Sequence, residues 1–114
     1  MKKYCELQDG YLLVRVPREL DHHQAGSIRM EADMMTEICH VRKIVFDFAE
    51  TEFMDSSGIG VIIGRSRNMG YCGGAVAARN MNERVKKIFM VSGLHKIVAM
   101  EGTEEMEKKH AESE

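Results

Sequence analysis

The sequence predicts a single α/β domain in which helices pack on a mixed, mostly parallel β-sheet. Two observations predict this class. Short apolar runs alternate with segments of helical periodicity after an initial hairpin, and the resulting order of elements is β-β-α-β-α-β-α-β. Strands that alternate with helices pair in parallel through crossover connections. We expect the domain to span residues 1–102, followed by a charged tail at 103–114 that is a short helix or disordered.

The chain opens with two predicted strands, at residues 3–8 and 11–16. Between them, Asp9 and Gly10 form a dipeptide that is a strong signal for a tight hairpin turn. Pro17 follows the second run, and proline ends a strand because it lacks a backbone N–H to donate to the ladder. The sheet should therefore begin with an antiparallel pair.

A first helix is predicted to start at Asp21. Asp21 is followed three residues later by Gln24, which resembles a capping box with aspartate in place of the usual serine or threonine. Apolar side chains then recur at helical spacing along one face: Ala25, Ile28, Ala32, Met35 and Cys39. We expect this face to cover the sheet.

The middle of the chain predicts two buried strands around a second helix. Residues 43–48 are almost wholly apolar and rich in β-branched and aromatic side chains, which is typical of a central strand covered on both faces. Residues 56–69 read as a helix, and residues 75–78 as a short buried strand. This arrangement is one βαβ crossover unit.

A third helix is predicted between Asn82, a good N-cap, and Gly93, a good C-cap. Leu94 can fold back on the last turn, as in a Schellman motif. Residues 96–100 read as the final strand.

Composition excludes several classes of function. The net charge of −2 gives no sign of a nucleic-acid surface, and no apolar run approaches the length of a membrane span or a signal peptide. Three widely spaced cysteines argue against a disulfide framework and for a reducing compartment, so we expect a cytoplasmic protein. No pair of cysteines or histidines has the spacing of a zinc site apart from two adjacent histidines, which cannot close one alone, so no metal is expected.

The second helix has an unusual composition, because it contains Gly58, Gly60 and Gly64. Each interior glycine costs a helix about 1 kcal/mol relative to alanine. Gly60 and Gly64 lie on one face, where close approach of another element and a functional reason are equally open explanations. Gly58 lies in the first turn, beside free N–H groups and the positive end of the helix dipole, a position that suits an anion or a close backbone contact.

Three residues at the start of this helix compete for one capping position. Asp55, Ser56 and Ser57 can each cap a helix, and one cap is enough. A plain N-cap role for Asp55 or Ser56 is the simple explanation, but it leaves the other two cap-competent residues unexplained. A spare hydroxyl at an exposed helix start could also accept a phosphoryl group, whose charge the helix dipole tolerates.

The stretch FMDSSGIGVIIGR, with ELDHH upstream and RVKKIFMVSGLHKIV downstream, resembles the STAS-domain anti-sigma factor antagonists, most closely the sporulation type of endospore-forming bacteria. The resemblance covers about residues 3–100 and implies a single STAS domain. It implies that Ser56, directly after the aspartate, is phosphorylated by an anti-sigma factor that is also a serine kinase and uses ATP. Unmodified antagonist would bind that partner and free the sigma factor for transcription. A PPM-type phosphatase would reset the switch.

The resemblance also implies a partner-binding surface, made of Asp21, Asp55, Ser56, Ser57, Gly58 and Ile59. A cap is as good an explanation for Asp21, a cap is favoured for Asp55, and core burial is at least as good for Ile59. The chain would be neither an enzyme nor a cofactor-binding protein, because catalysis belongs to the kinase. The best alternative is a STAS module of another signalling or transporter-associated complex, without a phosphoswitch.

Three other classes fit the sequence poorly. A serine hydrolase would need the G-x-S-x-G elbow, which DSSGIG lacks. A dinucleotide-binding loop should follow its strand at once, and about nine residues separate Phe48 from Gly58. A receiver domain with Asp47 as phosphoacceptor would want an acidic pair after the first strand, where this sequence has a hairpin.

Overall fold

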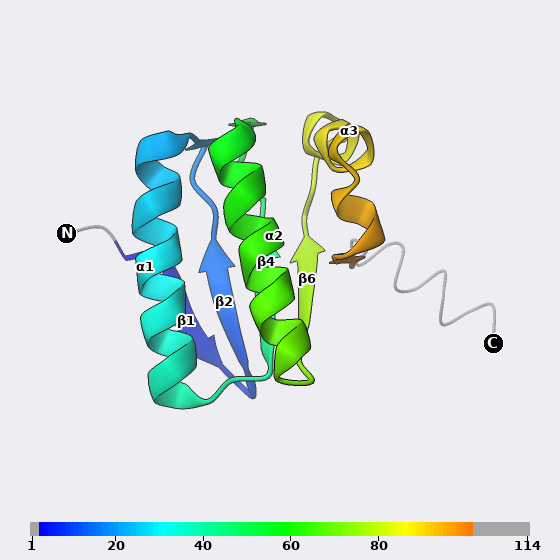
Figure 1. Ribbon diagram of the computed structural model, residues 1–114. Helices are drawn as coiled ribbons and strands as arrows, with labels where there is room; N and C mark the ends of the chain where they lie inside the picture. Colours follow the sequence, from blue (N-terminus) through cyan, green and yellow to red (C-terminus); the bar gives the residue numbers. More distant parts are fainter. Residues whose placement is uncertain (1–2, 102–114) are drawn as a thin grey trace.

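A computed structural model describes residues 3–101 as a five-stranded mixed β-sheet with helices packed against it and a small two-stranded sheet beside it (Figure 1). The sheet order is β1-β2-β4-β6-β7, and only the β1–β2 pair is antiparallel. The tail predicted at 103–114 lies outside the described residues. The elements, in chain order, are β1 (Cys5–Gln8), β2 (Tyr11–Arg15), β3 (Glu19–Leu20), α1 (His22–Cys39), β4 (Lys43–Asp47), β5 (Phe53–Met54), α2 (Ser56–Tyr71), β6 (Ala75–Arg79), α3 (Glu83–Ser92), the 3-10 helix η1 (Leu94–Lys96) and β7 (Ala99–Met100).

The hairpin and the parallel centre of the sheet confirm the predicted class. Gly10 turns the β1–β2 hairpin with a φ of 79°, a value that glycine adopts without a steric penalty. In the parallel part, Leu12 pairs with Ile44, which pairs with Val76. Helices α1 and α2 lie side by side across one face of this sheet, while α3 lies beyond β6 (Figure 1).

The core occupies the face that the helices cover. Phe46 and Phe48 are fully buried there, and Phe89 of α3 meets the Phe48 ring edge-on at 5.5 Å between centroids. Val45 points to the opposite face and is also fully buried, in a smaller cluster with Leu13 and Ala77. The prediction of a central strand buried on both faces is therefore confirmed.

Helix caps follow the sequence closely, with one exception. Asp21 accepts a hydrogen bond from the backbone N–H of Gln24 at 3.0 Å, and Asn82 accepts one from Val85 at 2.9 Å. The predicted capping box is only half formed, because the side chain of Gln24 is bonded to the hydroxyl of Tyr4 instead. Helix α1 is thereby tied to the start of β1.

The final predicted strand, at 96–100, is largely wrong. After Gly93, whose φ is 84°, the chain enters the 3-10 helix η1, and only Ala99–Met100 pair with β6. The N–H groups of Lys96, Ile97 and Val98 bond back to Gly93 or Leu94. Local turn bonds satisfy these backbone groups, so they are not available to a ladder.

The prediction also missed a two-stranded sheet, in which β3 runs parallel to β5. Leu20 is paired with Met54, and both side chains are buried. Strands of two residues are too short to show an alternating pattern. This small sheet positions the site described below. Within residues 3–101, none of the helices is long and apolar enough to cross a membrane.

Candidate functional site

The β3–β5 pair brings together two loops that are more than 30 residues apart in the chain. The N–H of Asp55 donates to the carbonyl of Leu20 at 3.1 Å, and a helix begins directly after each loop. The first turns of α1 and α2 therefore lie next to each other, at the upper end of both helices in Figure 1. All six residues of the predicted partner-binding surface belong to these loops and first turns.

Asp55 is the N-cap of α2 and also bonds to α1. Its Oδ1 accepts hydrogen bonds from the N–H groups of Ser57 at 2.9 Å and Gly58 at 3.0 Å. Its Oδ2 accepts one from the N–H of His22 at 3.1 Å. The carboxylate thus satisfies backbone donors of two helices, and the capping role favoured for Asp55 is confirmed.

The two serines differ in what their hydroxyls do. Ser57 is half-buried, and its Oγ lies 3.1 Å from Nδ1 of the His22 imidazole. Ser56 is exposed, and its hydroxyl has no hydrogen-bond partner among residues 3–101. With Asp55 acting as the cap, the hydroxyl of Ser56 is spare in the sense that the sequence predicted.

Gly58 is required by the close packing of α2 on β3. A Cβ at this position would lie 2.7 Å from both Cγ and the carbonyl oxygen of Leu20, and a backbone atom cannot move aside cheaply. Gly58 is buried under this contact. It therefore shapes the predicted surface through the backbone, without presenting a side chain.

Close packing does not explain Gly60 or Gly64. A Cβ at either position would meet no atom within 4 Å beyond its chain neighbours and the adjoining backbone of its own helix. The packing explanation, which the sequence left open for these two glycines, is therefore wrong within the described chain.

The remaining members of the predicted surface are partly exposed. Asp21 is half-buried as the N-cap of α1. Ile59 is half-buried and packs against the core, so the core explanation holds for part of its side chain. Sequence reasoning missed Phe53, which lies in β5 and is 50% exposed, an unusual state for a phenylalanine. Its position directly before the MDSSG stretch was the available signal.

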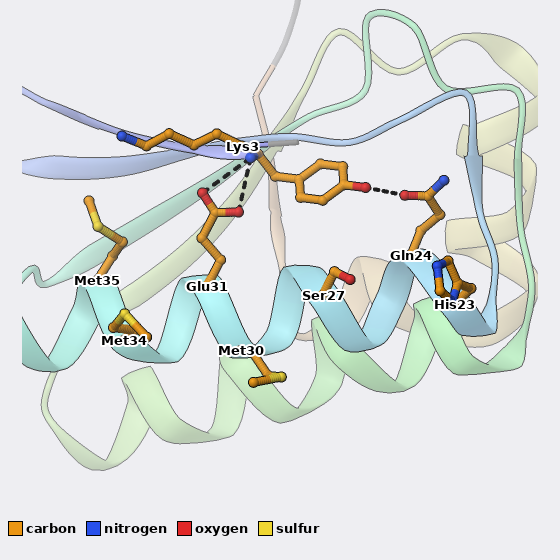
Figure 2. A pocket seen from close by; sticks show the side chains of 9 residues that line it. Lys3, His23, Gln24, Ser27, Met30, Glu31, Met34 and Met35 are labelled. Atoms are coloured by element: carbon orange, nitrogen blue, oxygen red, sulfur yellow. Dashed lines mark hydrogen bonds between the residues drawn. The ribbon is translucent and has the colours of Figure 1, made fainter. Parts of the chain in front are cut away.

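A separate cavity of about 790 Å³ lies between α1 and the start of β1 (Figure 2). The carboxylate of Glu31 crosses this region to accept hydrogen bonds from the N–H groups of Tyr4 and Cys5. None of the six predicted site residues lines the cavity. Its lining consists of Lys3, Tyr4, His23, Gln24, Ser27, Met30, Glu31, Met34 and Met35.

The model of the STAS domain family matches residues 4–110. The anti-sigma F factor antagonist of Paenibacillus polymyxa is 39% identical over 89 residues, which cover 78% of this chain and 76% of that protein. The chain belongs to the STAS-domain family of anti-sigma factor antagonists.

Solved structures of the family agree with this assignment. The unphosphorylated form of the anti-sigma factor antagonist SpoIIAA superposes with a TM-score of 0.70 and 27% identity, covering 95% of this chain and 96% of that one. The phosphorylated form of SpoIIAA from Bacillus gives a TM-score of 0.69 and 29% identity, covering 92% and 96%. The predicted single STAS domain with a mixed sheet is therefore confirmed.

Proposed function

We propose that this antagonist is a phosphoswitch controlled at Ser56. Its unphosphorylated form binds an anti-sigma factor that is also a serine kinase, and the bound anti-sigma factor releases its sigma factor. Phosphorylation of Ser56 blocks the binding, and a PPM-type serine phosphatase restores it. The protein acts in the cytoplasm, where its transcriptional target works.

The observation that carries the proposal is the contrast between the two serine hydroxyls. Ser56 is exposed and unbonded within the described residues, whereas Ser57 is half-buried and bonded to His22. A kinase reaches and deprotonates an acceptor hydroxyl more readily where no internal hydrogen bond has to break first. Ser56 is therefore the favoured acceptor of the two.

A phosphate at Ser56 would change the surface more than the fold. It adds a charge of about −1.5 to −2 at the N-terminus of α2, where the helix dipole favours an anion. The carboxylates at these two helix starts, on Asp21 and Asp55, are bound to helix N–H groups, so no ion pair of theirs has to break. We therefore expect the backbone to stay in place.

The phosphate should weaken binding of the anti-sigma factor, because the residues around Ser56 would form the contact with it. The surface around Ser56 combines the exposed side chain of Phe53 and the half-buried side chain of Ile59 with the carboxylates of Asp21 and Asp55. A dianion placed in such an interface loses its hydration and repels the carboxylates, unless the partner supplies an arginine. About 2.8 kcal/mol of lost affinity corresponds to a hundredfold weaker complex.

The chemistry of the switch belongs to its partners. Phosphoryl transfer requires Mg²⁺, phosphate-binding groups and a base near the acceptor. The chain has no GxxxxGK[ST] loop and no kinase motif set. It would supply the acceptor, while the anti-sigma factor would supply ATP, metal and base.

The proposal is tested by mixing the protein with an anti-sigma factor kinase and ATP and mapping the phosphate by mass spectrometry. Ser56→Ala should bind the kinase and take up far less phosphate than the wild type, and Ser56→Asp should bind poorly. Ser57→Ala is the matched control, because it removes the neighbouring hydroxyl and should leave phosphorylation at Ser56.

Uptake of phosphate by Ser56→Ala at the wild-type rate would refute the assignment. Binding of the wild-type chain without any phosphate uptake would favour the alternative, a STAS interaction module that has no phosphoswitch.

A further inference from the structure

We propose that His22 is a specificity-determining residue that keeps Ser57 from being phosphorylated in place of Ser56. The inference rests on the proposed function and adds to it a reason for the choice between two adjacent serines. Ser56 and Ser57 are both in the first turn of α2, so a kinase bound to this surface encounters both hydroxyls.

The contact between His22 and Ser57 joins two elements through side chains. Nδ1 of His22 lies 3.1 Å from Oγ of Ser57, across 35 positions of sequence. The backbone N–H of His22 is held separately, by Oδ2 of Asp55 at 3.1 Å. Because Asp55 fixes the start of α1 beside the start of α2, the backbone of His22 lies where its imidazole reaches Ser57.

This contact changes what Ser57 can do chemically. In transfer to serine, Oγ forms a bond to the γ-phosphorus of ATP, the bond from that phosphorus to the β–γ bridging oxygen breaks, and ADP leaves. The hydroxyl proton passes to a base on the kinase. At Ser57 the hydroxyl must first separate from the imidazole, and the imidazole occupies space beside Oγ. Ser56 carries neither restriction.

The size of the effect follows from the strength of one hydrogen bond. A neutral hydrogen bond at a partly exposed site contributes about 0.5–1.5 kcal/mol, which converts to about a two- to twelvefold preference. Removing the imidazole should therefore raise the share of phosphate on Ser57 by about that factor. It should not redirect the reaction completely, because Ser56 remains more exposed.

The experiment compares sites of phosphorylation in variants incubated with an anti-sigma factor kinase and ATP. In a Ser56→Ala background, His22→Ala should increase phosphate on Ser57 by about two- to twelvefold. His22→Asn is the conservative variant, because its side-chain amide can hydrogen-bond to Oγ of Ser57 as donor or acceptor. It should bring phosphate on Ser57 back toward the level seen with His22.

His23→Ala is the matched control. It makes the same change one position along the same helix, at a residue that is exposed and, within residues 3–101, has no hydrogen bond to either serine. It should leave Ser57 as poorly phosphorylated as in the Ser56→Ala protein. A general loosening of the α1 start would affect His22→Asn and His22→Ala alike, so the rescue separates specificity from structure.

The contact itself is measured independently of the kinase by the ¹⁵N chemical shift of His22 Nδ1. Ser57→Ala should move that resonance and Ser56→Ala should not. Equal phosphate on Ser57 with histidine, asparagine or alanine at position 22 would overturn the inference while leaving the proposed function standing. A wild-type chain that takes up no phosphate would overturn the proposed function, and the selectivity with it, even if the resonance behaved as expected.

Discussion

Replacing the glycines of α2 one at a time by alanine should separate a glycine that the fold needs from two that it does not. In Gly58→Ala, the new methyl would lie 2.7 Å from the carbonyl oxygen of Leu20, so β3 and α2 must move apart. Forcing an extra methyl into a packed site costs about 1–3 kcal/mol. The gain in helix propensity, below about 1 kcal/mol, offsets only part of this cost. We expect a net loss of stability.

Gly60→Ala and Gly64→Ala should instead raise the free energy of unfolding. Neither methyl would meet an atom within 4 Å beyond the adjoining backbone of α2. Each variant therefore keeps the gain in helix propensity, which stabilises the fold by about 0.5–1 kcal/mol. For a domain of this size, such a gain raises the melting temperature by about 2–8 °C.

Urea unfolding followed by far-ultraviolet circular dichroism measures all three variants under the same conditions. An unchanged dependence of the unfolding free energy on urea would show that the change lies in stability and not in the compactness of either state. The reasoning fails if Gly58→Ala is as stable as the wild type, or if Gly60→Ala is destabilised.

Two other predictions concern the cap and a buried thiol. Asp55→Ala should lower the free energy of unfolding more than Asp21→Ala, for which losing the cap costs about 1 kcal/mol. The reason is that Asp55 accepts from three backbone N–H groups and Asp21 from one. Equal losses in urea unfolding would contradict this. Burial, with a smaller effect from Glu31, raises the pKa of Cys5 from 9.0 to about 12. Between about pH 9 and 12 the folded state therefore keeps the Cys5 proton that the unfolded state releases. The contribution of this group to the free energy of unfolding is fully present below pH 9 and is lost as the pH rises toward 12. Cys5→Val should show a smaller loss of stability over that range, and an identical pH profile for both proteins would count against the assignment.

The local signals in the sequence predicted most of the fold because they act over a few residues. Asp21 and Asn82 each mark a helix start through one side-chain hydrogen bond to the backbone, and Gly93 marks a helix end through its φ of 84°. All three boundaries are where the sequence placed them. The apolar composition of residues 43–48 was enough to predict that this strand is buried. The strand at 96–100 was overestimated because apolar content does not reveal that a 3-10 turn takes up the backbone donors.

The features of the site that escaped prediction depend on distant parts of the chain. Nothing local to His22 shows that its ring meets Ser57, because the β3–β5 pair creates that contact. Helical spacing showed that Gly60 and Gly64 share a face, but not what lies opposite that face. The competition among three adjacent caps is local and predicted a spare hydroxyl at this helix start, while the choice of Ser56 came from the family resemblance.

The most direct test of the account is the affinity of an anti-sigma factor kinase for the unmodified chain and for the chain phosphorylated at Ser56, measured side by side by titration calorimetry. The account predicts that the phosphate weakens binding by about a hundredfold or more, close to 3 kcal/mol, while the backbone amide spectrum changes only around the starts of α1 and α2. Equal affinity of the two forms would contradict it.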